Sequence, residues 1–368
     1  MDFKKDYVYS ILNDKSQKYM DVDSNATDNG AWLDQYEWQN YNSQKWIIYP
    51  LDGGYYVLIN WASGRMVDVV NNSKDNGAML NQYEWQNSDS QQWNTEEKEE
   101  GYIAFQNKNS GKYADVDYNA TDNGDHLNQY EWQNSDSQKW MPTEVEQFTT
   151  LPSVETQDLP PVPQYTSIDE ILPDATDSVV TAYTLAPFFA VNDPQYDTWT
   201  VGNQANENPY YLYIKKQYWK LVKSLTLTPG ETQEYDLTYG ITTTDQQTAS
   251  LTVSNTIGAD AGLQFKDKSL GLSTQYTSEL NITISQTSEE MAQATNTYTI
   301  NNKYDHEIAW SKYILVTEYH VERTNGTTIN TLWSFADINT TRSVSYPPED
   351  TNSLVLNETL VSSTEIVR

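Results

Sequence analysis

The hexapeptide QYEWQN occupies residues 35–40 and recurs unchanged at 82–87 and 129–134, so that each copy begins 47 residues after the previous one. Each copy lies in a longer repeated segment, which reads DVDSNATDNGAWLDQYEWQNYNSQKW from Asp21. A period of 20–50 residues indicates a repeat architecture, because one unit alone cannot bury its own apolar face. Three units fill residues 1–144 and the phrase does not return afterwards, which favours a closed threefold arrangement over an open solenoid.

The local signals within each unit are those of β-structure. Runs such as KYMDVD (18–23) alternate apolar and polar residues, and Asp-Asn-Gly follows at 28–30, 75–77 and 122–124. Such a tripeptide between alternating runs is typical of a hairpin turn. No unit has the apolar period of a helix, so we expect three equal β units that close into a barrel.

The spacing of Gln-x-Trp resembles that of the ricin-B-type β-trefoil lectins. The motif stands at 44–46, 91–93 and 138–140, each time after an upstream Asp-Val. The resemblance covers the first 144 residues and recurs three times in register. It implies a β-trefoil whose Trp residues belong to the core.

Each repeat also contains the two groups that a shallow sugar site needs. An aromatic ring covers the C–H face of the sugar, and a carboxylate accepts charge-assisted hydrogen bonds from its hydroxyls. The resemblance implies that the Asp binds two ring hydroxyls, that a Tyr fifteen residues later stacks, and that the Gln of Gln-x-Trp steadies the Asp. Ser replaces the Asn that the family commonly has before this Gln, which affects the choice of sugar. The expected carbohydrate-binding residues are Asp21, Tyr36, Ser43, Gln44, Asp68, Tyr83, Ser90, Gln91, Asp115, Tyr130, Ser137 and Gln138.

Two other interpretations of the repeats are a folding scaffold without sugar binding and a calcium site. Asp21, Asp23 and Asn25 begin like an EF-hand loop, but such a loop needs Gly at its sixth position and Glu at its twelfth. Those positions hold Ala26 and Trp32. The sequence therefore favours sugar over calcium, and we expect neither a metal nor a cofactor.

The composition excludes several classes of partner and chemistry. The 368 residues carry a net charge of −30 and include no cysteine. Nucleic acid and anionic headgroups repel such a chain, and disulfide or thiol chemistry is impossible. The start, MDFKKDYVYS, lacks the apolar core of a signal peptide, and no run of 18 apolar residues occurs. We therefore expect synthesis in the cytosol.

The rest of the chain begins with a proline-rich stretch, 145–175, that predicts an extended linker or a strap along the next domain. The residues after it are rich in Thr, Ser, Tyr and Val and predict long strands. In 249–284 the apolar residues stand at odd positions up to Phe265, and at even positions after the charged tip 266–268. A strand that crosses a bilayer needs about 9–11 residues that alternate in this way.

This alternation has two interpretations, an ordinary hairpin with one buried face and a membrane-inserting hairpin. In the second, residues of one face contact lipid and those of the other line a water-filled pore. The lipid-facing set would be Ile257, Ala259, Ala261, Leu263, Phe265, Leu270, Leu272 and Tyr276. The pore-lining set would be Thr256, Asp260, Gln264, Ser273, Gln275 and Thr277.

Five segments decide between them, because they resemble the Bin-like insecticidal crystal toxins, also called the Tpp family. They are YTLAPFFAVNDP (183–194), NPYYLYIKKQYW (208–219), LTPGET (227–232), GADAGLQF (258–265) and GTTINTLW (326–333). The resemblance implies an all-β chain with a ricin-type trefoil before an aerolysin-like β-pore-forming domain. We expect the trefoil at 1–144, the linker or strap at 145–175, the pore-forming domain with its insertion hairpin at 176–347, and a tail at 348–368.

The resemblance implies a non-enzymatic insecticidal, mosquitocidal toxin, made without a signal peptide in the bacterial cytosol and stored in a crystal at sporulation. Its expected partners are galactose or N-acetylgalactosamine glycans on gut cells, the target membrane and further copies of itself in a pore, with no nucleic acid. A non-lytic lectin and one component of a binary toxin, which needs a partner chain, are the alternatives. A glycosidase with a lectin module needs paired carboxylates, and no such motif is evident after residue 150.

Overall fold

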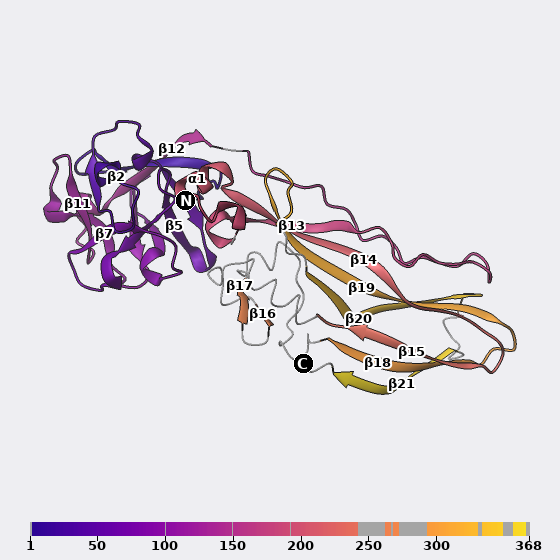
Figure 1. Cartoon of the computed structure of the whole chain (residues 1–368). Helices are drawn as coiled ribbons and strands as arrows, with labels where there is room; N and C mark the ends of the chain where they lie inside the picture. The colour runs from indigo at the N-terminus through magenta and orange to yellow at the C-terminus, as the bar shows by residue number, and fades with distance from the viewer. Residues whose placement is uncertain are drawn as a thin grey trace. The chain divides into compact units, whose positions relative to one another are not determined.

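The chain forms two compact units of mostly β-structure. Unit 1 comprises Met1–Pro152 and Pro187–Tyr211, and unit 2 comprises Ser153–Ala186 and Leu212–Arg368. Figure 1 shows the strands of both units and the short helix α1 (Val201–Glu207). The computed structural model describes residues 2–99, 101–148, 150–191, 193–241, 262–265, 268–271, 293–329, 333–348 and 356–365.

Unit 1 contains a 12-stranded sheet, to which each 47-residue repeat contributes four strands. The second and third strands of every repeat form a hairpin, and the first and fourth strands pair with those of neighbouring repeats. The predicted trefoil-like closure is confirmed. The strands are β1 (Tyr7–Asn13), β2 (Tyr19–Val22), β3 (Leu33–Tyr36), β4 (Trp46–Pro50), β5 (Tyr55–Asn60), β6 (Met66–Val69), β7 (Ala78–Tyr83), β8 (Trp93–Glu97), β9 (Ile103–Asn107), β10 (Tyr113–Val116), β11 (Asp125–Tyr130) and β12 (Trp140–Gln147).

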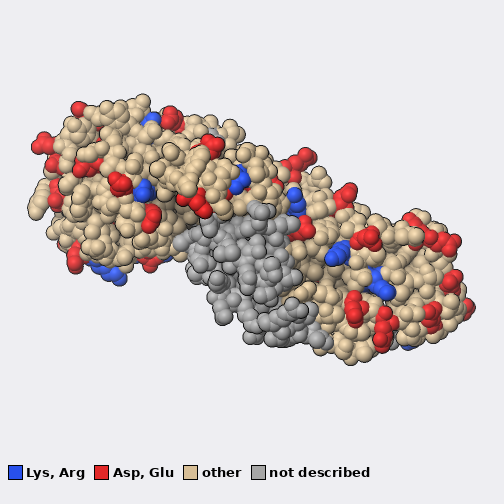
Figure 2. All heavy atoms as spheres, in the orientation of Figure 1, with Lys and Arg blue, Asp and Glu red and all other residues tan. Residues whose placement is uncertain are grey.

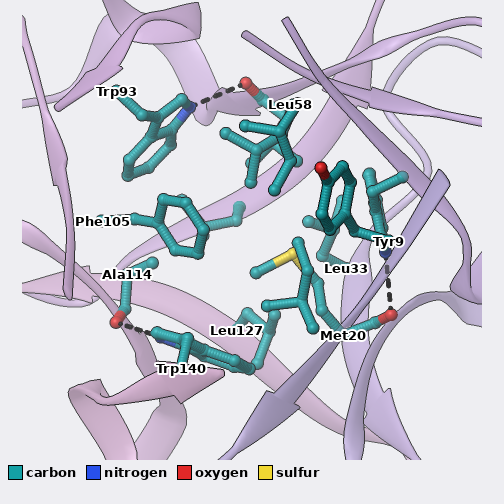
Figure 3. Close-up of a cluster of buried hydrophobic side chains, with 14 of the residues drawn as sticks. Tyr9, Met20, Leu33, Leu58, Trp93, Phe105, Ala114, Leu127 and Trp140 are labelled. Carbon is teal, nitrogen blue, oxygen red and sulfur yellow. Dashed lines mark hydrogen bonds between the residues drawn. The ribbon is translucent and has the colours of Figure 1, made fainter. Parts of the chain in front are cut away.

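The three Gln-x-Trp tryptophans lie in the core of this unit, as predicted. Trp46, Trp93 and Trp140 are each 0% exposed. Every indole Nε1 donates to a backbone carbonyl in the second strand of its own repeat, at 3.0 to 3.2 Å. Figure 3 shows the bond from Trp140 to Ala114 within the surrounding apolar cluster. A buried N–H thus finds an acceptor, so the large rings enter the core without an unmet polar group.

The first residue of each QYEWQN copy joins neighbouring repeats. The side chains of Gln35, Gln82 and Gln129 are 0% exposed. Gln35 accepts a 2.6 Å hydrogen bond from Ser16 of its own repeat, and its amide donates at 3.2 Å to two carbonyls of the third repeat. The same contacts recur around the ring, with Ser63, Gln82, Ala26 and Asp28, and with Ser110, Gln129, Ser73 and Asp75.

The Asp-Asn-Gly turns dock onto these glutamines. Gly30 has a φ of 85°, in the region that favours glycine, and its N–H donates to the Gln82 carbonyl of the next repeat at 2.8 Å. The Asn29 side chain accepts from the Glu84 N–H at 2.9 Å. The two other turns make the same bonds. The turns predicted from sequence therefore also link one repeat to the next.

Residues 187–211 pack on the first and second repeats. The ring of Phe189 lies 5.2 Å from that of Trp85 and 5.8 Å from that of Tyr49, measured between centroids. Gly202 of α1 approaches the backbone so closely that an added Cβ would lie 2.2 Å from the carbonyl oxygen of Ala62. This excursion of the chain is thus an integral part of unit 1.

Unit 2 is built on long strands, as the sequence predicts. β14 has 18 residues and β19 has 16, against about five or six for a typical strand. The described residues form a four-stranded sheet in the order β13-β14-β19-β20 and a three-stranded sheet in the order β15-β18-β21. The strands are β13 (Val179–Pro187), β14 (Tyr210–Leu227), β15 (Thr232–Tyr239), β18 (Ala294–Asn302), β19 (Ile308–Arg323), β20 (Trp333–Tyr346) and β21 (Leu356–Glu365).

The proline-rich stretch runs along unit 2. Tyr165 is 8% exposed, and its hydroxyl lies 2.6 Å from that of Ser311 on β19. The Trp219 indole donates to the Pro160 carbonyl at 3.0 Å. Leu172 is buried in the same apolar cluster. These contacts are those of a strap held by side chains rather than of a free linker.

Most of the hairpin predicted at 249–284 lies outside the described residues. The exceptions are β16 (Gly262–Phe265) and β17 (Lys268–Gly271), which pair antiparallel with Leu263 opposite Leu270. The strands end and begin at the tip that the sequence assigns to 266–268, with Lys268 as the first residue of β17. Among the described residues, no helix is both long enough and apolar enough to span a membrane.

Substituting a core tryptophan tests the repeat-forming role of these rings. Trp140→Phe leaves the buried Ala114 carbonyl without its donor, so we expect a loss of about 1–3 kcal/mol in the free energy of unfolding. Urea denaturation followed by circular dichroism measures it. Trp199→Phe is the matched control, because Trp199 is 43% exposed, and we expect a change below about 0.5 kcal/mol. Equal effects of the two variants would contradict the assigned role.

Candidate carbohydrate-binding sites

One face of the hairpin β2–β3 brings the predicted site residues of the first repeat together. Asp21 stands opposite Asp34, and Tyr19 stands opposite Tyr36. Residues two apart on a strand share a face, so two carboxyl groups and two phenol rings line one side. The second repeat places Met66, Asp68, Asn81 and Tyr83 in the same register, and the third places Tyr113, Asp115, Asn128 and Tyr130.

The three site aspartates are buried at the base of this face. Asp21, Asp68 and Asp115 are 7%, 8% and 4% exposed, whereas the paired tyrosines are half-buried. Burial raises the pKa of each aspartate, and hydrogen bonds from a serine and from the following backbone N–H offset part of that rise. A carboxylate beneath a partly exposed ring suits a ligand with hydroxyl groups and an apolar face.

The predicted serines support the sites from below. Ser43, Ser90 and Ser137 are at most 1% exposed. Ser90 donates to Asp68 at 2.6 Å. Ser43 and Ser137 donate to Asn25 and Asn119, at 2.6 and 2.9 Å, and each is also near enough to its site aspartate to lower the pKa of that carboxyl group. These hydroxyls therefore hold neighbouring side chains, and the exposed surface above them comes from other residues.

The Gln of Gln-x-Trp is held mainly by the QYEWQN loop. Gln44 accepts from the Gln39 N–H at 2.8 Å and donates to the Glu37 carbonyl at 2.9 Å. Gln91 and Gln138 make the same pair of bonds in their repeats. Gln44 also contributes a hydrogen bond that lowers the pKa of Asp21, against the larger rise from burial. This Gln therefore fixes the loop that follows the Tyr predicted to stack on the sugar.

Sequence reasoning missed the residue opposite each site aspartate. Asp34, Asn81 and Asn128 are 3%, 8% and 3% exposed, and the Oδ1 atom of each is buried without a hydrogen-bond partner. Burial, followed by the charges of Asp21, Asp23 and Asp125, raises the pKa of Asp34 to about 7. The alignment of repeats at a stride of 47 contains this signal, since the position is polar in all three copies.

The three sites differ in their surroundings. Trp38 packs against Tyr19 at 4.9 Å and Trp132 against Tyr113 at 5.0 Å between centroids, whereas Trp85 packs against Phe189. In addition, Tyr118 beside the third site is 93% exposed at a φ of 53°, which is strained for an aromatic residue. The tryptophan of the second repeat thus packs on residues 187–211 rather than on its own hairpin, and the third repeat has an extra exposed ring.

The described residues offer little for other chemistry. No group of three or more His, Asp or Glu side chains within them could hold a metal ion. Asp and Glu lie scattered over the face drawn in Figure 2, with Lys and Arg interspersed singly. The predicted hairpin residues 256–261 and 272–277 lie outside the described part of the chain.

Comparison with known proteins fits this geometry. Residues 2–83 and 89–160 match a family model described as a ricin-type beta-trefoil lectin domain-like family. Residues 179–347 match a second model, described as Insecticidal Crystal Toxin, P42. The repeats therefore form a lectin-type trefoil domain, followed by a toxin domain.

Curated relatives come from two bacteria. The larvicide subunit BinA of Lysinibacillus sphaericus is 29% identical over 217 residues, covering 58% of this chain and 58% of BinA. BinB of the same species is 27% identical over 216 residues, covering 58% of this chain and 46% of BinB. The insecticidal crystal protein Cry35Ab1 of Bacillus thuringiensis is 28% identical over 221 residues, covering 57% and 55%. The chain spans about half the length of these relatives in the matches.

The crystal structure of Cry35Ab1 shares the fold over nearly the whole chain. It aligns with a TM-score of 0.74 at 22% sequence identity and covers 94% of this chain and 91% of that one. The chain belongs to the insecticidal crystal toxin family that includes BinA, BinB and Cry35-like proteins, and it carries a ricin-B-type trefoil lectin domain. This family of toxins is typically non-enzymatic. The predicted family and fold class are confirmed.

The charge state of Asp34 gives a stability test of this site. Because the pKa of Asp34 rises from 3.8 to about 7 on folding, the folded chain keeps a proton that the unfolded chain releases. Stability therefore falls as the pH rises from about 4 to about 7. We expect Asp34→Asn to be more stable than the parent at pH 8, by at most about 4 kcal/mol for three pKa units, and nearly equal to it at pH 4.

Thermal unfolding of both proteins at the two pH values measures this difference. Asp28→Asn serves as a control in the same repeat, because Asp28 is exposed and its substitution should change the stability by less than about 0.5 kcal/mol. A constant difference between Asp34→Asn and the parent at pH 4 and pH 8 would rule out a buried proton at this position.

Proposed function

We propose that this chain is a glycan-targeted β-pore-forming toxin that acts on insect gut cells. The observation that carries the proposal is the threefold recurrence of a buried Asp and a half-buried Tyr on one hairpin face, on a chain whose second half matches the insecticidal toxin family. The trefoil would select the target membrane, and unit 2 would permeabilise it after assembly into an oligomer.

Galactose or N-acetylgalactosamine suits each site. Vicinal hydroxyls can donate to the two oxygens of the Asp carboxylate, while the apolar C–H face of the ring lies on the Tyr. A single site of this kind holds its sugar at about millimolar, near −4 kcal/mol. Three sites on one rigid domain gain about 10²-fold on a glycan-dense surface by avidity.

The arrangement around the hairpin region supports the pore proposal. β15 and β18 pair antiparallel over their whole length, with Tyr239 opposite Ala294. The two ends of the segment 240–293 therefore lie next to each other at the end of this strand pair, and the segment contains the paired strands β16 and β17. An isolated hairpin would expose unpaired backbone groups to hydrocarbon, each costing several kcal/mol, so insertion requires a closed ring of copies.

A partner chain is the second possibility for the same fold. The relatives BinA and BinB are named as subunits of a binary larvicide, so this chain would be one component of a two-chain toxin if it cannot act alone. Storage in a parasporal crystal follows from the likeness to the insecticidal crystal protein Cry35Ab1. Both proposals leave the sugar sites and the hairpin with the same roles.

Removing the site carboxylates tests the targeting step. We expect Asp21→Ala, Asp68→Ala and Asp115→Ala to weaken binding to galactose-coated surfaces in steps, because each removes one charge-assisted acceptor from a multivalent contact. Surface plasmon resonance on such a surface measures the apparent affinity. Asp28→Ala, an exposed position in the same repeat, is the control. A folded triple variant that binds like the parent would exclude these sites.

Charge reversal in the hairpin tests the pore. We expect the parent to form cation-preferring channels, because one Asp260 per subunit would place a ring of negative charge in the lumen. Asp260→Lys should reduce or reverse the preference, as read from reversal potentials in planar bilayers that contain a galactosyl lipid. Unchanged selectivity would remove Asp260 from the lumen. Binding without conductance would favour the non-lytic lectin or the binary toxin.

A further inference from the structure

We propose that the residue opposite each site aspartate is a positioning residue for the sugar site, and that Asp34 makes the first of the three sites weaken at alkaline pH while the second and third sites do not. The proposal rests on the proposed function of the trefoil as a sugar-binding domain. It goes further by giving the three sites different behaviour, although their predicted ligand residues are the same.

The register is the first observation. Asp34, Asn81 and Asn128 pair directly with Asp21, Asp68 and Asp115 across the hairpins. Directly opposed side chains of an antiparallel pair have Cβ atoms about 4.5–5.5 Å apart. The orientation of each site aspartate therefore depends on the neighbour it faces, which is an amide in two repeats and a carboxyl group in the first.

Burial defines the kind of role. All three residues are more than nine-tenths buried, and the Oδ1 atom of each lies without a hydrogen-bond partner. Each of these residues lies directly opposite its site aspartate, so we assign it the role of positioning that aspartate. Recurrence of the same unpartnered atom in all three repeats links it to the shared site rather than to a local irregularity of one hairpin.

The charges around Asp34 explain why the first repeat differs. Asp34 is paired with Asp21 of β2 on one side and with His126 of β11 on the other. The charges of Asp21, of Asp23 in the turn after β2 and of Asp125 on β11 also act on it. Burial and the three carboxylates raise the pKa of Asp34 to about 7. Below this pH the neutral carboxyl group matches the amide of Asn81 and Asn128 in shape and charge.

Ionisation of Asp34 places a second negative charge beside Asp21 in a desolvated position. Like charges so close repel each other, and Asp21 needs its carboxylate both charged and in place to accept two sugar hydroxyls. An amide cannot ionise, so the second and third sites keep their geometry. The trefoil would then engage three sugars below about pH 7 and bind the sugar of the first site more weakly above it.

Single-site versions of the full chain separate the sites. Asp68→Ala with Asp115→Ala leaves the first site, and Asp21→Ala with Asp115→Ala leaves the second. We measure the dissociation constant of methyl β-galactoside by NMR titration at pH 6 and pH 9. We expect the first site to weaken about tenfold at pH 9 from like-charge repulsion, and the second site to change less than about twofold.

The decisive test exchanges the residue types at positions 34 and 81. Asp34→Asn should abolish the pH dependence of the first site, and Asn81→Asp should create it in the second. If the single-site chains do not fold, the parent and Asp34→Asn are compared instead at pH 9. We then count the sugars that each protein binds, and we expect two for the parent and three for the variant. Circular dichroism checks folding in each case.

The outcomes distinguish this inference from the function on which it rests. Sugar binding at neither site and neither pH would refute the proposed function, and this inference with it. Sugar binding that depends on pH equally at both sites, or that the exchanged residues leave unchanged, would overturn the role of Asp34 while the lectin function stands.

Discussion

The buried amide that begins each QYEWQN copy holds the trefoil together. A glutamine side chain out of water loses its hydration, so it is tolerated where its oxygen and its N–H groups find partners. Gln35 meets this condition by bonding to Ser16 and to two carbonyls of another repeat. Because each of the three amides reaches into a different neighbour, they form a closed ring. This polar network is stable only when every member has its partners, and it therefore requires the same spacing of 47 residues in each repeat.

The same network sets the position of the proposed sugar sites. The Tyr predicted to stack on the sugar is the residue after this Gln, and the backbone N–H of the residue after the Tyr bonds to the Asn of a neighbouring turn. The ring therefore sits on a strand end that is held at both sides by other repeats. A rigid arrangement of this kind lowers the ordering cost of binding, which matters most when each contact is weak.

Much of the fold could be predicted from the sequence because the repeats carry redundant signals. The core tryptophans, the Asp-Asn-Gly turns and the long strands of unit 2 follow from period, turn chemistry and composition, and the structure contains them. The neighbours of Asp21 could not be found in this way, since Asp34 becomes its partner only through the hairpin register. The serines before Gln-x-Trp look like ligand positions in the sequence, yet they lie beneath the surface. Nothing in the sequence of residues 187–211 indicates that they belong to unit 1.

That last segment has a consequence for how such toxins can diversify. The chain passes from unit 1 to unit 2 after Pro152, returns at Pro187 and leaves again after Tyr211. Its helix fits against Ala62 with no space for a side chain at Gly202, and Phe189 covers Trp85. The lectin half is therefore not a detachable cassette. Recombination that exchanges the first 152 residues alone would join a new trefoil to a segment shaped for the old one, so new specificities should arise by point substitution within the repeats rather than by shuffling whole domains.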